Sequence, residues 1–425
     1  MSSVELGPAF FLSVVVILGV CRLVGLALRG LGQPPVVGEM VAGVALGPSV
    51  LGLLAPGAEH ALFPQDLRPV LYVTGQIGLV IFMFQAGYEF RTDRIRQVAR
   101  SAAAISTAGI LAPLLLGAAL AWGARGRVAI FPAGTRPLAT ILFVGVALAI
   151  TAFPMLARII TERGLTGSRY GSVALAAGAL DDAVAWVLLA GVVSLARGSS
   201  GPLLLAVVGT AVLAVLLALL VRLRGRATAL AGRLPTGELL PAVVAVLFLT
   251  AWYTDRIGLY AVFGAFGLGV CFPRSAAVDR AMGLFTPLGR TVLLPLFFTY
   301  SGLNTDFGRF TDPTLLLFAG CCVAAAVVGK LGACWGAARL VGERPGIALR
   351  VGTLMNARGL MQLIAVNVGL SEGIISPSLF TVLVVVALVT TVMTSPLLTL
   401  WDRLGARTGD PTPDTPSPSS VTSRA

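Results

Sequence analysis

Charged residues are scarce in this chain of 425 residues, since Asp, Glu, Lys and Arg together make up only 12% of it. Hydrophobic residues make up 56%, and the mean hydropathy is +0.91. Apolar runs of about 20 residues recur from Pro8 to Trp401, and each is long enough to cross a hydrocarbon core of about 30 Å. The composition therefore excludes a soluble globular protein and predicts an all-α, polytopic membrane protein.

Histidine is almost absent and cysteine is rare. His60 is the only histidine, and it lies in a loop with Pro and Gly where we expect it to be solvated. The cysteines lie inside apolar runs without a Cys-x-x-Cys pair, so no metal or redox cofactor is expected. A nucleophile with a histidine base is also excluded, so the chain is not expected to be an enzyme. The five cysteines are Cys21, Cys271, Cys321, Cys322 and Cys334.

Basic residues outnumber acidic ones, and the net charge is +12. The arginines gather in short loops between apolar runs, as the positive-inside bias of membrane proteins requires, so no nucleic-acid partner is expected. They are most frequent after odd-numbered runs. This predicts a cell-membrane protein whose N-terminus is outside and whose C-terminus is cytoplasmic. The first run follows no basic segment and is too long for a cleaved signal, so we expect it to be retained.

The apolar runs predict thirteen transmembrane helices within a domain of residues 1–401. A first repeat of six (about 8–197) and a second of six (about 238–401) flank a linking helix (about 202–223), which would invert the second repeat. Residues 402–425, rich in Pro, Ser and Thr, are expected to form a disordered cytoplasmic tail with no regulatory domain after it. The predicted spans are 8–30, 35–54, 68–90, 98–123, 137–161, 169–197, 202–223, 238–256, 258–273, 286–303, 313–341, 346–370 and 376–401.

Two spans at matched positions in the repeats are interrupted. In span 137–161, Pro154 removes a backbone donor and predicts unwinding near Thr151. Span 346–370 carries Asn356, Arg358 and Gly359 at its middle. Ordinary kinks would explain either site alone. The pair instead indicates an inverted-repeat transporter, whose broken helices present their dipole ends to an ion near the bilayer midplane.

Ionisable residues also lie at membrane depth, where each costs at least about 2.5–3.5 kcal/mol unless it faces a cavity or a partner. Asp181 and Asp182 lie at the middle of one span, and Lys330, the only lysine, lies at the middle of another. Arg158 and Arg358 are further candidates. Adjacent helical residues point about 100° apart, so the two aspartates are expected to have different roles.

Two carboxylates and one amine in a dry cleft would form a coupled titrating set. A metal cation could displace protons from such a set, and the site could hold a proton or a cation but not both well. Competition for one site is the minimum requirement of antiport, provided that the site can face either side of the membrane.

The chain resembles the monovalent cation/proton antiporter-2 (CPA2) family of the Na⁺/H⁺ exchanger type, along nearly its whole membrane part. Several motifs in the family's order carry the resemblance. They are "GQPPVVGEMVAGVALGPSVLG" (Gly32–Gly52), "TAFPMLARIITERGL" (Thr151–Leu165), "ALDDAVAW" (Ala179–Trp186), "LLPLFFTYSGLNTD" (Leu293–Asp306), "GKLGA" (Gly329–Ala333) and "MNARGLMQLIAVNVGL" (Met355–Leu370).

The resemblance implies a thirteen-helix antiporter fold with two crossed broken helices, a homodimer and an elevator-like core domain. It makes Asp182 the carrier of the proton and of the transported Na⁺, and it pairs Asp181 with Lys330. A double aspartate with a lysine is associated with electrogenic exchange. Gln362 departs from the family's usual Glu, which puts any role of that acid in doubt.

Smaller expectations concern the surroundings of this site. Thr151 and Asn356 could ligate the cation at the two breaks, or they could be merely structural. Arg358 could neutralise helix ends where the broken helices cross. Glu39 and Glu89 could line a cytoplasmic funnel, or they could lie at the membrane interface. A K⁺/H⁺ antiporter of the same fold remains the alternative to Na⁺ or Li⁺ exchange, and a cation channel is a more distant one. Membrane lipid, a monovalent cation and protons are the expected partners.

Overall fold

The structure is a computed structural model, and it describes residues 3–30, 32–90, 95–128, 130–132, 134–165, 167–198, 201–305, 307 and 312–407. Within these residues the chain forms helices joined by turns and contains no β-strand. Its contacts divide it into two compact units. Unit 1 comprises Met1–Ala27, Gly38–Thr92 and Trp186–Phe310, and unit 2 comprises Leu28–Val37, Asp93–Ala185 and Thr311–Ala425.

Unit 1 is built around α4, which packs along α12 and α14. Two of its segments, η1 and η4, are π-helical. Its helices are α1 (Ser3–Arg29) and α2 (Pro35–Leu46), which extend slightly beyond the unit, then η1 (Pro48–Gly52), α3 (Pro56–Leu62), η2 (Gln65–Leu67), α4 (Arg68–Glu89), α9 (Gly201–Arg222), α10 (Arg224–Arg233), α11 (Thr236–Arg256), α12 (Ala261–Cys271), α13 (Ala276–Leu288), η4 (Gly289–Leu293) and α14 (Leu294–Leu303).

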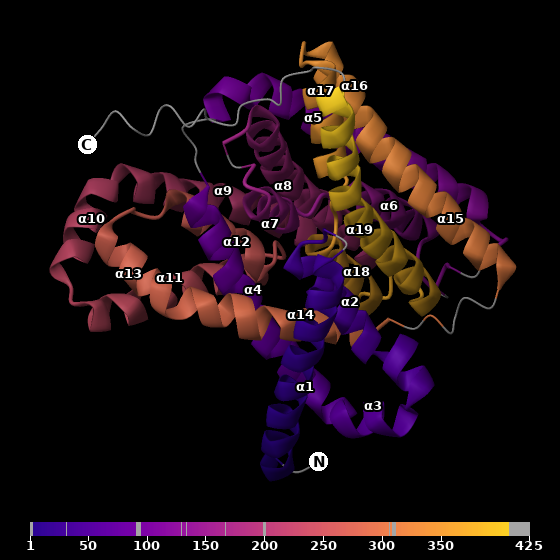
Figure 1. Ribbon diagram of the computed structural model, residues 1–425, viewed down its shortest axis with the longest axis horizontal. Coiled ribbons are helices and arrows are strands. Elements are labelled where there is room, and N and C mark those ends of the chain that lie inside the picture. Colours follow the sequence, from indigo (N-terminus) through magenta and orange to yellow (C-terminus); the bar gives the residue numbers. More distant parts are fainter. Residues whose placement is uncertain are drawn as a thin grey trace. The chain divides into compact units, whose positions relative to one another are not determined.

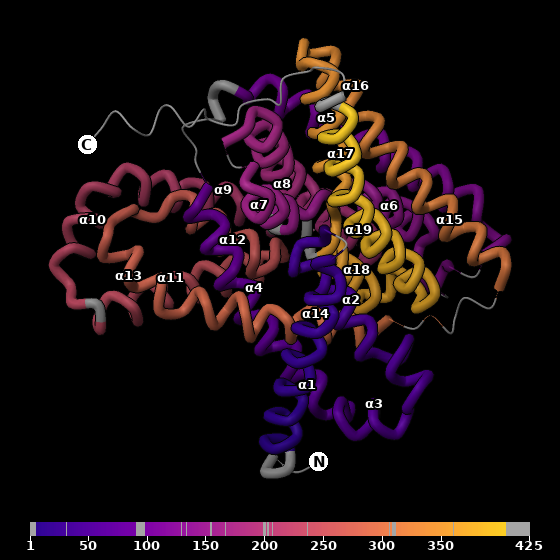
Figure 2. Tube along the Cα trace, in the orientation of Figure 1, coloured from indigo at the N-terminus to yellow at the C-terminus, as the bar shows by residue number. Residues whose placement is uncertain are grey.

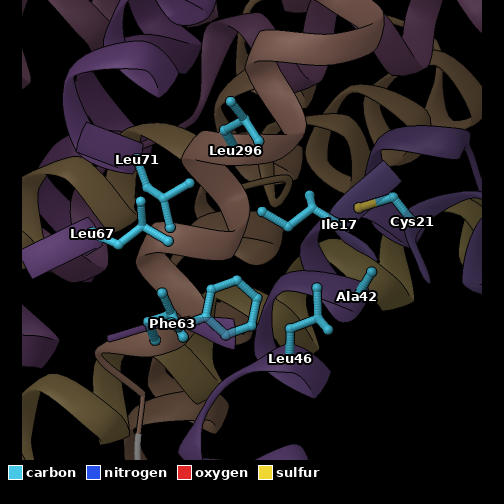
Figure 3. Packing of buried hydrophobic residues seen from close by; sticks show 9 residues of the cluster. Ile17, Cys21, Ala42, Leu46, Phe63, Leu67, Leu71 and Leu296 are labelled. Carbon is cyan, nitrogen blue, oxygen red and sulfur yellow. The ribbon is translucent and has the colours of Figure 1, made fainter. Parts of the chain in front are cut away.

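A cluster of buried apolar side chains holds α1, α2, α4 and α14 together within unit 1 (Figure 3). Phe63, Leu67 and Leu71 contribute from the start of α4 and the turn before it, and all three are fully buried. The cluster therefore joins segments of unit 1 that are far apart in the sequence. Its members are Ile17, Cys21, Ala42, Leu46, Phe63, Leu67, Leu71, Leu296 and Leu303.

Unit 2 contains two helices that are each interrupted by a short break. In it α5 packs along α6, α15 and α16, while α19 packs against α15, α17 and α18 (Figure 1). Figure 2 traces the chain through these elements. Its helices are α5 (Ile95–Ala124), α6 (Pro137–Ala149), α7 (Phe153–Glu162), the part of α8 (Arg169–Arg197) up to Ala185, α15 (Pro313–Val327), the π-helical η6 (Val328–Gly332), α16 (Ala333–Leu340), α17 (Pro345–Met355), α18 (Leu360–Ser371) and α19 (Pro377–Arg407).

The helices have the length and composition of a multi-pass membrane protein. Among the described residues, eight helical stretches are long and apolar enough to cross a membrane, and the bent pair α9–α10 would make a ninth. Shorter apolar helices, including α2, α6, α12 and most of α18, add to these. The all-helical membrane class predicted by the sequence is confirmed.

Several boundaries differ from those predicted. The arginine-rich segment after span 202–223 was expected to be a loop but forms α10, because Arg, Ala and Leu are good helix formers. His60 lies in the short helix α3 rather than in a loop, and its side chain is exposed as expected. The span that was predicted to begin at residue 286 begins ten residues earlier, with α13 at Ala276. There the Ser275 hydroxyl caps the helix by accepting from the Val278 N–H. Residues 402–407, assigned to the tail, continue α19, and residues 408–425 lie outside the described part.

Gly43 of α2 and Gly302 of α14 bring two backbones of unit 1 into contact. A Cβ atom at Gly302 would overlap the carbonyl group of Gly43. We expect Gly302→Ala to destabilise the protein by about 1–3 kcal/mol, because neither backbone can yield in a packed interior. Thermal unfolding of the detergent-solubilised protein measures this. Gly283→Ala in α13 is the matched control, since its Cβ would meet nothing within 4 Å, and it should be neutral or slightly stabilising. Equal midpoints for both variants would contradict the close packing.

Candidate functional site

Two helix breaks meet inside unit 2. One lies between α6 and α7 and the other between α17 and α18, about 200 residues apart in sequence. The Ala152 N–H donates to the Ala357 carbonyl at 3.1 Å. The Thr151 hydroxyl oxygen lies 3.4 Å from the Met355 carbonyl oxygen. The two interruptions that the sequence predicts are therefore in direct contact.

Local chemistry explains both breaks. Pro154 lies in the first turn of α7, where its missing N–H is harmless but prevents continuation from α6. Residues 150 and 152 have extended backbone there. In the other break, Gly359 precedes α18 with φ of 67°. That left-handed conformation favours glycine because a Cβ atom would be strained there.

Lys330 lies in the π-helical segment η6 and is fully buried. Its Nζ atom donates to the Asp181 Oδ2 atom at 2.6 Å, to the Ala149 carbonyl at 2.6 Å and to the Gly109 carbonyl at 2.7 Å. An ammonium group has three N–H donors, so three acceptors match its charged form. π-Helical turns are frequent at functional sites, and this one carries the only lysine of the chain.

Asp181 is the anionic partner of Lys330, and neither side chain is exposed. The same Oδ2 atom accepts a hydrogen bond from the Thr151 hydroxyl at 2.7 Å. Thr151 therefore links the α6–α7 break to the ion pair. The Asp181 Oδ1 atom is buried and has no partner within the described residues.

Two cations lie at the C-terminal end of α6. The last carbonyls of a helix lack internal donors and carry its negative dipole end. Lys330 donates to the Ala149 carbonyl, and the Arg358 Nη1 atom donates to the Ala147 carbonyl at 3.2 Å. Arg358 is fully buried. The break between α17 and α18 thus supplies a positive charge to the broken end of α6.

Asp182 has a different environment, as expected for the residue next to Asp181. It is 7% exposed, and no lysine or arginine among the described residues forms an ion pair with it. Its carboxylate accepts a backbone hydrogen bond from Phe153, the first residue of α7. The positive end of a helix dipole favours an anion at this position. The Asp182 Oδ1 atom is buried and has no partner within the described part of the chain.

Asn356 is the second group with unused hydrogen-bonding capacity. It is fully buried, and the described residues offer a partner to neither its Oδ1 nor its Nδ2 atom. Buried polar atoms without a protein partner normally bind water or a ligand. Carboxylate and amide oxygens are the ligands that hard cations prefer. The unpartnered oxygens of Asp181, Asp182 and Asn356 therefore give unit 2 the chemistry of a cation site.

The other candidates from the sequence lie outside this cluster. Glu39 in α2 and Glu89 at the end of α4 belong to unit 1, and Glu89 accepts from Gln85 at 2.8 Å. Arg158 pairs with Glu162 one turn along α7 at 2.9 Å. Gln362 is buried in α18 and donates to the Leu383 carbonyl at 3.1 Å. The backbone acceptors of Lys330 could not be predicted from the sequence, because carbonyl groups carry no residue-type signal of their own.

A polar cluster around Glu343, in the turn between α16 and α17, was also not predicted from the sequence. Arg169 donates to both carboxylate oxygens of Glu343 at 2.9 Å, and the Ser101 hydroxyl donates to it at 2.7 Å. Burial alone would raise the pKa of the Glu343 carboxyl. The hydrogen bonds from Arg169 and Ser101, together with the charge of Arg169, outweigh burial and hold this pKa below its ordinary value of 4.5. The cluster ties α5 and the start of α8 to the turn before α17.

Comparison with known proteins identifies the family. The family described as "Sodium/hydrogen exchanger, transmembrane" matches residues 14–400. The chain belongs to the sodium/hydrogen exchanger family. This is a family of transporters. The matched region includes all residues of the candidate site, namely Thr151, Asp181, Asp182, Lys330, Asn356 and Arg358.

Relatives within the sodium/hydrogen exchanger family cover most of the chain. It is 37% identical over 396 residues to the Na⁺/H⁺ antiporter NhaS4 of Synechocystis, covering 91% of this chain and 95% of that protein. It is 32% identical to cation/H⁺ antiporter 17 of Arabidopsis thaliana, covering 92% of this chain. The chain spans about half the length of this Arabidopsis relative, 48%.

A solved structure shares the fold of the exchanger. The sodium proton antiporter MjNhaP1 of Methanocaldococcus jannaschii superposes with a TM-score of 0.68 at 16% identity, covering 97% of this chain and 100% of that one. At this identity the likeness establishes the fold. The CPA2-type resemblance seen in the sequence is confirmed at the level of the family.

The ion pair predicts an asymmetric response to mutation. Lys330→Met leaves the Asp181 carboxylate buried without a cation, which we expect to cost about 3–5 kcal/mol. The double variant Asp181→Asn/Lys330→Met removes both charges and should recover most of that loss. Thermal unfolding in detergent measures both variants. A double variant as unstable as the single one would show that charge pairing is not what holds this site together.

The Glu343 cluster predicts a pH-dependent stability. Because the folded-state pKa lies below 4.5, its contribution is present above pH 4.5 and is lost as the pH falls through the lowered pKa. Glu343→Gln should therefore unfold at a lower temperature than the wild type at pH 7, with the difference shrinking below pH 4.5. Unfolding midpoints measured from pH 7 to pH 3 test this. A difference that stays constant over that range would contradict the ionic contribution.

Proposed function

We propose that this exchanger is a secondary active transporter that exchanges protons for a monovalent cation, Na⁺ or Li⁺, by alternating access. The observation that carries the proposal is the environment of Asp182: a buried carboxylate at a helix N-terminus, without a cationic partner, next to an aspartate that already has one. The names of the relatives, which include Na⁺/H⁺ and cation/H⁺ antiporters, support it.

In the proposed mechanism Asp182 holds either a proton or the cation. A proton neutralises the carboxylate in its dry surroundings, and a cation does the same when other oxygens complete its shell. Thr151 and Asn356, one in each helix break, are the proposed additional ligands. Release of the proton on one side frees Asp182 for the cation, and loss of the cation on the other side lets a proton return.

Asp181 and Lys330 are proposed to make the exchange electrogenic. A double aspartate with a lysine is the pattern that the family resemblance associates with two protons moving against one cation. The ammonium and the Arg358 guanidinium also keep the end of α6 neutralised while Asp182 changes its occupant. The transported ion is a substrate in this scheme, and no cofactor is required.

We propose that the helices combine into thirteen spans, with α6–α7 and α17–α18 as the matched broken spans of inverted repeats 8–197 and 238–401 and with α9 linking them. The site residues all belong to unit 2, which supports unit 2 as the moving core of an elevator. The proposed arrangement is a homodimer in the cell membrane with the N-terminus outside. The C-terminus would lie in the cytoplasm.

Potassium is the second candidate cation. The chain is 29% identical to K⁺/H⁺ antiporter 1 of Saccharomyces cerevisiae and 25% identical to the Na⁺/H⁺–K⁺ antiporter GerN of Bacillus cereus. Carboxylate, hydroxyl and amide oxygens suit either ion, so selectivity would depend on the size of the shell. A cation channel would use the same oxygens but would not couple cation flux to protons.

Asp182→Asn should abolish exchange and leave the protein folded, because the amide keeps the shape of the side chain but loses its titratable charge. Proteoliposomes with an internal pH dye measure this as cation-driven alkalinisation, with Na⁺, Li⁺ and K⁺ in turn. Glu238→Gln, the same change at an exposed residue at the start of α11, should retain wild-type exchange. Normal exchange by Asp182→Asn would refute its assignment as the carrier, and cation flux without alkalinisation would favour a channel.

A further inference from the structure

The long helix α5 contains Pro113 in its interior. A proline has no N–H, so the carbonyl four residues earlier, that of Gly109, loses its helical donor. The Lys330 ammonium donates to this same carbonyl at 2.7 Å. A buried carbonyl without a donor is costly, so Lys330 satisfies a group that Pro113 leaves open.

Close packing holds the two segments together at this point. A Cβ atom at Gly109 would lie 2.6 Å from the Cys334 Sγ atom and 3.6 Å from the Lys330 Nζ atom. A Cβ atom at Gly329 would lie 3.0 Å from the Pro113 Cα atom. Glycine on both sides of the contact leaves room for this close approach. The lysine reaches its carbonyl only because α5 and η6 approach this closely.

A second proline of unit 2 shows the same arrangement without a charge. Pro396 lies inside α19, and the carbonyl four residues earlier, that of Val392, accepts a hydrogen bond from the Gln33 amide at 2.8 Å. A side chain from another segment thus occupies the open carbonyl in both cases. Pro396 provides a matched control, because the carbonyl that it leaves open, that of Val392, accepts from a neutral donor.

We infer that Pro113 is a positioning residue for the exchange: by leaving the Gly109 carbonyl open, it fixes the third acceptor of the Lys330 ammonium. The inference rests on the proposed function for its transport measurement. If Pro113 is replaced by alanine, the new N–H competes with the Lys330 ammonium for the Gly109 carbonyl.

The other charged and titratable groups around Lys330 are unchanged by this substitution. They are Asp181 and Asp182 on α8, Cys334 on α16 and Arg358 in the break between α17 and α18. A change in the exchange rate would therefore report on the acceptor at Gly109.

The first experiment compares the initial rates of Na⁺-driven exchange in proteoliposomes of the wild type, Pro113→Ala and Pro396→Ala. For Pro113→Ala we expect the rate to fall roughly tenfold, the effect of losing one hydrogen bond to a charged group. Pro396→Ala should keep the wild-type rate. An unchanged rate for Pro113→Ala, or equal losses for both variants, would overturn the inference.

A second experiment needs no transport, so it separates failure of this inference from failure of the proposed function. Unfolding midpoints are compared for Pro113→Ala in the wild type and in Asp181→Asn/Lys330→Met. Without the lysine, the alanine only gains a helical hydrogen bond, so it should raise the midpoint by about 2 °C more than in the wild type. Equal effects in both backgrounds would show that Pro113 does not act through Lys330. If Pro113→Ala does not fold, Pro113→Ser supplies the same N–H and replaces it in both experiments.

Discussion

The buried ion pair between Asp181 and Lys330 is the interaction on which the polar interior of unit 2 depends. Through three hydrogen bonds the lysine joins the middle of α5, the broken end of α6 and the middle of α8. Neither charge contacts solvent, and an unpaired charge in such surroundings would be strongly destabilising. The positions of these three helices and the charge state of the pair are therefore linked.

The helix breaks explain how one apolar unit can hold charges of both signs. A broken helix exposes carbonyls at one end and N–H groups at the other. In unit 2 the cations Lys330 and Arg358 lie at the carbonyl end of α6, and Asp182 lies at the N–H end of α7. The same interruption thus places charges of both signs beside backbone groups of opposite polarity. The partial charges at the helix ends thus stabilise these charged side chains, a role that water has for charges on the surface of a soluble protein.

Much of this arrangement follows from the sequence, because its signals are local. Pro154 and Gly359 mark the breaks, and aspartates and a lone lysine at membrane depth need partners. Other features depend on which segments meet in space. The cluster of Ser101, Arg169 and Glu343 joins three distant segments, and none of the three stands out in the sequence. The backbone acceptors of Lys330 could not be predicted either, because every residue has a carbonyl group. The segment that forms α10 was predicted to be a loop because it is rich in arginine, although arginine, alanine and leucine also favour a helix.

Proton release on cation binding tests the central claim, that Asp182 holds either a proton or a cation. Na⁺, Li⁺ or K⁺ is added to the detergent-solubilised protein in weakly buffered solution containing a pH dye, and binding is followed in parallel by calorimetry. We expect the bound cation to release protons from the wild type and to release none from Asp182→Asn. Cation binding to the wild type without proton release, or undiminished release from Asp182→Asn, would contradict the claim.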